Sequence, residues 1–271
     1  MAAGEIRARI AGQHALICQL TEAISGEIID AGSELRIIAN VAAGYENIDV
    51  AAAKARGIVV TNTPDVLTEA TAEFTWGLIL AIARRIAEGD RLVRRGAWRG
   101  WALDFMPGTE LRGKQLGIIG AGRIGRAVAA KASAFGMTVK FARRDLSLDE
   151  LLVTSDVISL HVPGGAATRH MIDRKTFARM KRSALLVNTS RGTVVDEEAL
   201  AWALKEHLIA GAALDVYERE PEIHHPLLAM ENVVLAPHLG SATRETRTAM
   251  AMRAVDNVLA VLGGEPPITP V

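Results

Sequence analysis

The chain has 271 residues, 49% of them hydrophobic, and its 31 basic and 31 acidic residues give a formal net charge of zero. This length and apolar content suit one large α/β domain or two smaller domains with a buried core. The zero net charge argues against a nucleic-acid or membrane-surface role, and the single cysteine excludes an internal disulfide. No apolar run is long enough to span a bilayer, so we expect a soluble, cytoplasmic protein.

The first third of the sequence predicts a small group of strands followed by a helix. Three apolar runs have the length of strands, at 15–18, 36–41 and 58–61. A longer apolar segment at 66–88 predicts one continuous helix that links them to the rest of the chain.

From residue 113 onward, strand-sized apolar runs alternate with helical segments. The runs lie at 115–119, 137–142, 157–162, 184–188, 211–216 and 233–236, and helices are expected at 126–135, 148–153, 196–206 and 242–262. Ser147 and Glu150 have the spacing of a capping box at the start of the second of these helices. Strands separated by helical crossovers predict a parallel sheet with helices on both faces, and six strands match a complete doubly wound dinucleotide-binding unit.

The segment 116–125 is an apolar strand that runs into three glycines, Gly120, Gly122 and Gly125. Gly120 allows a tight turn, Gly122 lets the backbone approach phosphates, and Gly125 lets the following helix pack close to the strand. The free amides of the helix N-terminus then bind the pyrophosphate. An ordinary turn could carry the same glycines, so the motif indicates a dinucleotide only together with its context.

The next predicted strand ends in Arg143, Arg144 and Asp145. A cofactor with free ribose hydroxyls favours an acid at the first of these positions, whereas two guanidinium groups favour a 2′-phosphate. We therefore expect NADP, with NAD as the alternative. The alternative stays open because both arginines could simply be exposed at a strand end, and Asp145 could pair with one of them.

Polar residues follow the carboxyl ends of the predicted strands, where ligands bind in open α/β sheets. These strand-end residues are Gly120, Arg143, Pro163, Arg191, Asp215 and His238. Taken singly, each could be a surface cation, a cap or a loop residue. Together, an arginine, an acid and a histidine can bind a carboxylate, stabilise a protonated imidazole and exchange the proton that accompanies hydride transfer.

Five ordered segments carry a more specific pattern: VAAGYENID at 41–49, TNTPDVLT at 61–68, NTSRGTVVD at 188–196, GAALDVYEREP at 211–221 and PHLGS at 237–241. In these segments the chain resembles the D-isomer-specific 2-hydroxyacid dehydrogenases, and most of all their glyoxylate/hydroxypyruvate reductase branch. The resemblance covers almost the whole chain.

The resemblance implies an oxidoreductase that transfers a hydride between NADP(H) and a small 2-oxoacid, with glyoxylate or hydroxypyruvate as the expected substrate. It implies that Arg191 binds the substrate carboxylate and carbonyl, that His238 is the acid/base with Glu220 as its partner, and that the amides of Ala43 and Gly44 hold the carboxylate. Asp215 would contact the nicotinamide carboxamide. The residues expected to contact the cofactor are Gly120, Gly122, Arg123, Ile124, Gly125, Arg143, Arg144, Pro163, Thr168, Thr189, Ser190, Asp215 and Gly240.

Two domains are implied as well. Residues 1–62 and 243–271 would form a truncated, flavodoxin-like α/β substrate domain, and residues 63–242 a Rossmann-type cofactor domain. Compared with the family, the chain lacks two strands and a helix at its N-terminus, which leaves 15–18 as an exposed sheet edge. A segment after Asp145 is also missing, and its loss shortens the wall around the adenine.

Two other functions stay open: a non-catalytic dinucleotide-sensing protein on the same fold, and a phosphoglycerate dehydrogenase.

We expect a homodimer, because in similar proteins an aromatic side chain near Phe105 reaches across the subunit interface. We expect no metal, because His224 and His225 are adjacent, face different ways and have no third ligand. Nucleic acid and membrane are not expected partners.

Overall fold

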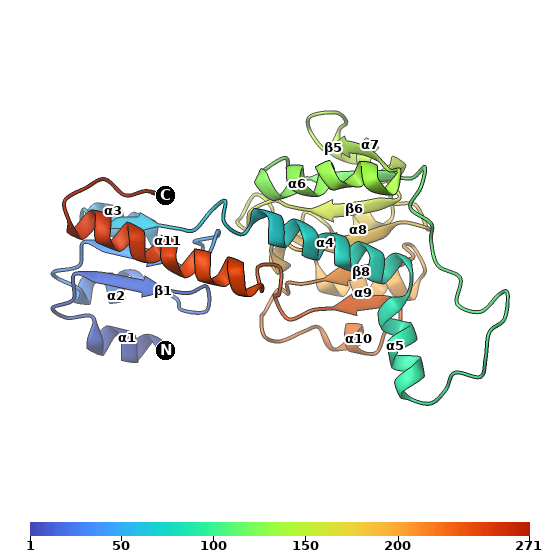
Figure 1. The fold of residues 1–271 in the computed structure, drawn as a ribbon, viewed down its shortest axis with the longest axis horizontal. Coiled ribbons are helices and arrows are strands. Elements are labelled where there is room, and N and C mark those ends of the chain that lie inside the picture. Colours follow the sequence, from blue (N-terminus) through green and yellow to red (C-terminus); the bar gives the residue numbers. More distant parts are fainter. The chain divides into compact units, whose positions relative to one another are not determined.

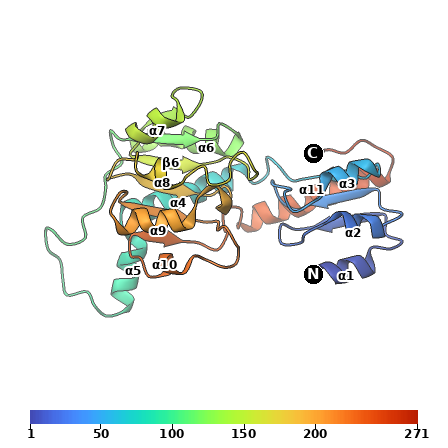
Figure 2. The same cartoon turned by 180° about the vertical axis from the view of Figure 1, so that it is seen from behind.

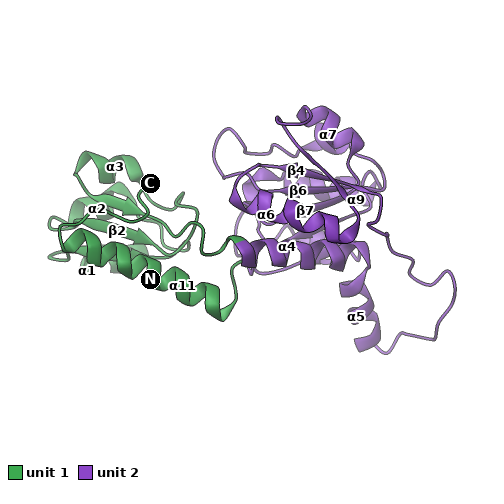
Figure 3. Cartoon of the chain, turned by 45° about the horizontal axis from the view of Figure 1, so that its top comes forward, with its two compact units in different colours: residues 1–68, 241–271 green, residues 69–240 purple.

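The computed structural model describes residues 1–271 and divides the chain into two compact units (Figure 3). Unit 1 comprises residues 1–68 and 241–271, and unit 2 comprises residues 69–240. These divisions lie close to the domain boundaries expected after residues 62 and 242.

Unit 1 is built on a three-stranded parallel sheet in the order β1-β2-β3. Its elements are α1 (Ala3–Arg9), β1 (Ala15–Cys18), α2 (Gly26–Ala31), β2 (Ile37–Asn40), α3 (Val50–Ala55), β3 (Val59–Thr61) and α11 (Arg244–Leu262). Successive residues of β2 face opposite ways: Ile38 packs with Ile28 and Ile29 of α2, whereas Ile37 packs with α11. Helices therefore cover both faces of this sheet. β1 is an edge strand, with Ile17 46% exposed.

Unit 2 contains a six-stranded sheet in the order β5-β4-β6-β7-β8-β9, in which every neighbouring pair is parallel (Figures 1 and 2). The strands are β4 (Gln115–Ile119), β5 (Thr138–Phe141), β6 (Val157–Leu160), β7 (Leu185–Asn188), β8 (Gly211–Leu214) and β9 (Val233–Leu235). Each strand lies within the run that predicts it. The inner strands β6, β7 and β8 are buried at every residue, which requires a largely apolar sequence, whereas the edge strand β5 is partly exposed.

The helices of unit 2 cover both faces of this sheet, as expected for a doubly wound fold. They are α4 (Thr68–Ala83), α5 (Ile86–Arg94), α6 (Arg123–Lys131), α7 (Leu148–Thr154), α8 (Arg174–Phe177), α9 (Glu197–Lys205) and α10 (His225–Leu228), with the 3₁₀ helices η1 (Ala132–Phe135) and η2 (Gly192–Val194). On one face Trp76 of α4 and Val128 of α6 pack with Val187 of β7. On the other, Leu200 of α9 packs with Leu186 of the same strand.

The start of α7 confirms the capping box. Ser147 Oγ accepts a hydrogen bond from the Glu150 amide at 3.2 Å, and Glu150 Oε2 accepts from the Ser147 amide at 2.9 Å. The helix expected at 126–135 begins earlier, at Arg123, and its last turn tightens into η1. The glycine turn is thus followed directly by the helix.

The strand order differs from that of a complete dinucleotide-binding unit, in which two strands lie on one side of the first strand and three on the other. In this sheet β4 is the first strand, and β5 is the one strand on that side of it. Residues 142–147 form the whole connection from β5 to α7, and a further parallel strand with its crossover needs a dozen or more residues. The expected six strands are present, but the sheet ends at β5.

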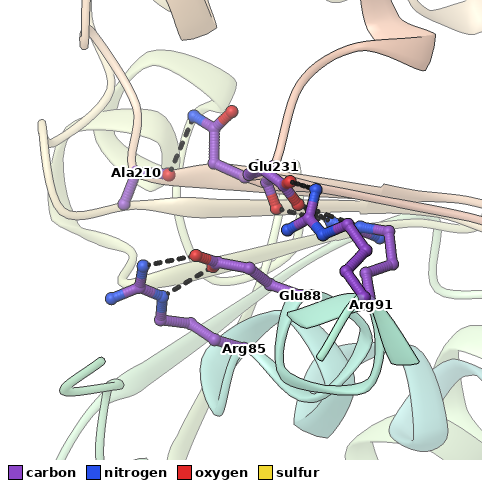
Figure 4. A network of polar contacts seen from close by, with 7 residues as sticks. Arg85, Glu88, Arg91, Ala210 and Glu231 are labelled. Carbon is purple, nitrogen blue, oxygen red and sulfur yellow. Dashed lines mark hydrogen bonds and ion pairs between the residues drawn. The ribbon is translucent and has the colours of Figure 1, made fainter. Parts of the chain in front are cut away.

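The prediction of a single helix at 66–88 is wrong, because the chain forms α4 and α5 with a break at Arg84 and Arg85. Arg85 has a left-handed φ of 54°. The amide of Thr109 donates to the carbonyl of Ala83 at 2.7 Å, and so takes the acceptor that a continuing helix would use. After the break, Arg85 pairs with Glu88, and Arg91 of α5 pairs with Glu231 just before β9 (Figure 4).

The segment after α5 extends away from the body of unit 2 (Figure 1). It carries large apolar side chains that are exposed, namely Trp98, Trp101, Leu103 and Phe105, with Trp101 80% and Leu103 90% exposed. We call residues 97–107 the arm. No helix in the structure has the length and apolar character needed to cross a membrane.

Candidate active site

The six strand-end residues predicted from the sequence lie along one edge of the unit 2 sheet. All strands are parallel, so the residues that follow their carboxyl ends share this edge. In sheet order they are Arg143 after β5, Gly120 after β4, Pro163 after β6, Arg191 after β7, Asp215 after β8 and His238 after β9.

The glycine turn has no room for side chains at two of its three glycines. Gly120 has a φ of 109°, and a Cβ there would lie 2.4 Å from the carbonyl oxygen of His161. A Cβ at Gly125 would lie 2.1 Å from the carbonyl oxygen of Gly120. Gly122 is different, because its Cβ would enter open space at the N-terminus of α6. The turn is therefore closely packed at Gly120 and Gly125, and it is open at Gly122, where a phosphate would approach.

The two arginines after β5 lie in a tight, exposed turn. Arg143 has a φ of 63°, and its amide donates to the carbonyl of Leu146 at 2.7 Å. Asp145 Oδ2 accepts from the Phe141 amide at 2.9 Å, which folds the turn back on the strand. The guanidinium of Arg144 lies 5.4 Å from the Phe141 ring centroid and 3.9 Å from the Asp145 carboxylate. Arg144 is thus partly engaged within the turn.

The loop after β6 is closed by Thr168. Its hydroxyl donates to the carbonyl of Pro163 at 2.7 Å. This contact fixes the loop that carries Pro163 and Thr168, directly after the backbone of His161 and Val162 that packs against Gly120.

The turn that carries Arg191 is organised by Asn188, which the sequence analysis missed. Asn188 is fully buried; its Oδ1 accepts from the amide of Ser190 at 3.0 Å, and its Nδ2 donates to the carbonyl of Arg191 at 2.9 Å. Thr189 Oγ1 lies 2.9 Å from Thr75 Oγ1 of α4. A polar residue that ends an otherwise apolar strand was the signal for this role.

His238 and Glu220 form a close pair. Nδ1 of His238 lies 2.8 Å from Oε2 of Glu220, while Oε1 of Glu220 accepts from the Tyr217 amide at 3.0 Å. Burial opposes ionisation of Glu220, but the hydrogen bonds from His238 and Tyr217 and the charges of His238 and Arg191 outweigh it, so the pKa of Glu220 lies below its usual 4.5. Glu220 is therefore a carboxylate at neutral pH.

Asp215 holds the backbone that follows His238. It is 1% exposed, and its two oxygens accept from the amides of Leu239 at 2.6 Å and Gly240 at 2.8 Å. Its own carbonyl accepts from the amide of His238 at 2.9 Å. Burial raises the pKa of Asp215, although the two amides act in the opposite direction. The structure thus gives Asp215 a structural role, and its contact with a nicotinamide stays a prediction.

Ala43 and Gly44 lie in unit 1, in the loop after β2. Side-chain amides fix both carbonyls: Asn62 Nδ2 donates to Ala43 at 2.7 Å, and Asn40 Nδ2 donates to Gly44 at 2.8 Å. The loop is therefore rigidly held at the carboxyl end of its strand.

A cavity of about 560 Å³ lies at the opposite edge of the unit 2 sheet. It is lined by Leu185, Ala210 and Asn232, which lie at the amino ends of β7, β8 and β9. None of the strand-end residues lines it. This cavity is therefore separate from the site predicted at the carboxyl edge.

Comparison with known proteins decides the family. Residues 76–240 match the family described as D-isomer specific 2-hydroxyacid dehydrogenase, NAD binding domain. The chain is 50% identical to a glyoxylate reductase of Korarchaeum cryptofilum, over 96% of this chain and 82% of the relative. It is also 50% identical to a glyoxylate reductase of Aeropyrum pernix, over 93% of this chain and 81% of the relative. The chain belongs to the D-isomer specific 2-hydroxyacid dehydrogenase family.

Solved structures agree with this assignment. A protein from Thermus thermophilus is 46% identical and superposes with a TM-score of 0.96, covering all of this chain and 90% of that one. An NADPH-dependent glyoxylate/hydroxypyruvate reductase from Sinorhizobium meliloti, in complex with NADP and malonate, is 36% identical with a TM-score of 0.89, covering 98% and 87% of the two chains.

As a member of the 2-hydroxyacid dehydrogenase family, the chain is an oxidoreductase that transfers a hydride between a nicotinamide dinucleotide and a 2-oxoacid. Its fold is the expected combination of a Rossmann-type sheet with a smaller α/β unit. These similarities favour an enzyme over the alternative of a non-catalytic dinucleotide sensor.

Proposed function

We propose that this dehydrogenase reduces glyoxylate, hydroxypyruvate or a similar small 2-oxoacid with NADPH, and that His238 supplies the proton. The observation that carries the proposal is the 2.8 Å contact between His238 and Glu220, on the sheet edge that also holds Arg191 and the glycine turn. Two similar proteins are glyoxylate reductases, and a similar structure is a glyoxylate/hydroxypyruvate reductase.

The carboxyl edge of unit 2 fits a dinucleotide. The open side of Gly122 and the N-terminus of α6 suit a pyrophosphate, since the first amides of a helix are free to bind an anion. Gly120, Arg123, Ile124 and Gly125 complete this turn. Pro163, Thr168, Thr189, Ser190, Asp215 and Gly240 would surround the nicotinamide half. When bound, the cofactor supplies the hydride for reduction or accepts it in the reverse direction.

The residues of the chain then bind the substrate and move a proton. The Arg191 guanidinium pairs with the substrate carboxylate and polarises the neighbouring carbonyl. His238 donates a proton from Nε2, because Nδ1 faces Glu220. The carbonyl oxygen gains this proton as the carbonyl carbon gains the hydride, and His238 is reprotonated from solvent, to which 34% of its side chain is exposed. The Glu220 carboxylate stabilises the protonated imidazole.

NADP is the proposed cofactor because of Arg143 and Arg144. Both side chains are exposed at the end of β5, where a ribose 2′-phosphate would lie. Arg144 is partly engaged by Phe141 and Asp145, so we assign the larger share of phosphate binding to Arg143.

The test is the loss of NADPH absorbance in the presence of a panel of 2-oxoacids. We expect turnover with glyoxylate and hydroxypyruvate and none without a 2-oxoacid. NADPH binding measured separately, by fluorescence, distinguishes an inactive enzyme from one that cannot bind cofactor. Measurable NADPH binding with no turnover across the whole panel would contradict the proposal.

We also propose that two copies of the chain associate through unit 2, with the arm of each copy on the other. The arm exposes Trp98, Trp101, Leu103 and Phe105, and burying such side chains against a second copy removes a large apolar area from water. Sedimentation at several concentrations should show a dimer, and Trp101→Ser with Leu103→Ser should shift it toward monomer. A wild-type monomer at all concentrations contradicts the dimer.

A cytoplasmic location of the protein stays a prediction from the sequence.

A further inference from the structure

One buried carboxylate holds both ends of the loop that carries Glu220. Glu197, the first residue of α9, is 6% exposed. Its Oε1 accepts from the amide of Glu218 at 2.7 Å, and its Oε2 accepts from the amide of His224 at 3.0 Å. Glu220 lies between these two anchor points. Both oxygens of Glu197 therefore fix the backbone of the Glu220 loop, residues 218–224.

The segment that precedes α9 also packs against the start of this loop. A Cβ at Gly192 would lie 1.8 Å from the carbonyl carbon of Tyr217 and 2.5 Å from the amide nitrogen of Glu218. The two backbones are thus in direct contact, with no room for a side chain between them. The segment 191–197 begins with Arg191 and ends with Glu197, so the same stretch of chain holds both the arginine and the loop of Glu220.

We propose that Glu197 is a positioning residue for the acid/base pair. It acts through Glu220: by fixing the amides of Glu218 and His224, it keeps Oε2 of Glu220 2.8 Å from Nδ1 of His238. When either anchor is lost, the loop gains freedom and the carboxylate no longer holds the imidazole in one orientation. This inference rests on the proposed function, which assigns the proton transfer to His238.

Other charged groups face the same loop but contact its side chains. The Glu218 carboxylate lies 2.6 Å from Nε2 of His170 and 3.3 Å from Arg169. Glu220 is influenced by the charges of His238 and Arg191. Arg219 and Glu222 are exposed. The two hydrogen bonds of Glu197 instead go to backbone amides, so Glu197→Gln changes how the loop backbone is held and replaces none of the side chains named here.

The first variant is Glu197→Gln, which replaces one acceptor oxygen by an NH₂ group and so places a donor against an amide donor. Its matched control is Glu198→Gln, the same change at the next residue, which is 76% exposed and pairs with Arg174. The second variant, His224→Pro, keeps the carboxylate and removes one of its donors. His224 has a φ of −55°, which proline accepts. The readouts are thermal stability, NADPH affinity, kcat and KM.

We expect Glu197→Gln and His224→Pro to keep NADPH affinity and to lower kcat about 10- to 100-fold, since a small misplacement of catalytic groups has effects of this size. Glu198→Gln should match wild type. In a Glu220→Gln background, Glu197→Gln should add little, because both changes break the same contact. Wild-type kcat in Glu197→Gln, or a loss that multiplies fully with that of Glu220→Gln, would overturn the inference. If Glu197→Gln does not fold, the kcat of His224→Pro tests the inference by itself, and a wild-type value would overturn it.

A readout without turnover separates this inference from the proposed function. Long-range ¹H–¹⁵N spectra at alkaline pH report which ring nitrogen of His238 carries the proton. We expect one tautomer, protonated at Nδ1, in wild type and a mixture in Glu197→Gln and in Glu220→Gln. An unchanged tautomer in Glu197→Gln overturns the inference even if no 2-oxoacid is turned over.

Discussion

Nδ1 of His238 lies 2.8 Å from Oε2 of Glu220, although the two residues follow different strands and are eighteen positions apart. The contact fixes the orientation of the imidazole and leaves Nε2 for the substrate. Removing the Glu220 carboxylate measures what it contributes to this pair.

Glu220→Gln should lower kcat for reduction by on the order of 10- to 100-fold, less than the full contribution of a general acid. The pH dependence should change as well. The pKa of Glu220 lies below 4.5, so the group is a carboxylate across neutral pH and gains a proton only in acid. The advantage of wild type over Glu220→Gln in kcat should therefore be full at neutral pH and shrink as the pH falls through the pKa of Glu220. Glu222→Gln, an exposed acid of the same loop, is the control, and an identical pH dependence of kcat in both variants would count against the pair.

Arg143→Asn should raise the KM for NADPH about 10-fold or more and leave the KM for NADH nearly unchanged. A charged hydrogen bond to a phosphate is worth about 1.5–3 kcal/mol, and asparagine tolerates the positive φ at this position. Arg144→Ala should have a smaller effect, because Arg144 is already engaged by Phe141 and Asp145. Equal changes for NADPH and NADH would refute the assignment of NADP.

Gly122→Ala and Gly125→Ala should separate cofactor binding from packing. A Cβ at Gly122 enters open space, so the variant should keep its melting temperature but bind NADPH more weakly. A Cβ at Gly125 meets the Gly120 carbonyl at 2.1 Å, so that variant should lose stability, by about 1–3 kcal/mol for overpacking. Thermal unfolding and NADPH titration of both proteins check this, and equal melting temperatures would contradict the geometry of the turn.

Much of the fold can be predicted from the sequence because most strands of the unit 2 sheet are buried on both faces. A strand that helices cover on both sides lies within an apolar run, and β4 is found at the predicted residues 115–119. The break between α4 and α5 could not be predicted, since it depends on Thr109, far along the chain, which takes the carbonyl of Ala83. The contacts of Glu197 could not be predicted either, since its partners Glu218 and His224 also lie far along the chain. An acid in the first turn of a helix is usually exposed, and only the loop from β8 buries this one.

Asp156→Asn should lower the free energy of unfolding at neutral pH by about 1–2 kcal/mol. Burial raises the pKa of Asp156, but the amide of Gln115 at 2.9 Å and the Lys181 ammonium at 3.0 Å outweigh it, so the pKa lies below the usual 3.8. A carboxyl with a folded-state pKa below its unfolded value stabilises the fold above the unfolded pKa and loses this contribution as pH falls through the folded pKa. Urea unfolding should therefore show a difference between the two proteins at pH 7 that disappears in strong acid. A difference that persists there would exclude the ionised carboxylate as its source.

If His238 transfers the proton to the 2-oxoacid, its removal must slow reduction while the cofactor still binds. The rate of NADPH oxidation with saturating glyoxylate is compared in wild type and in His238→Gln, with NADPH affinity measured on the same samples. We predict unchanged NADPH affinity and a kcat reduced by about 10²- to 10⁴-fold in the variant. A kcat within a few-fold of wild type would contradict the assignment of His238.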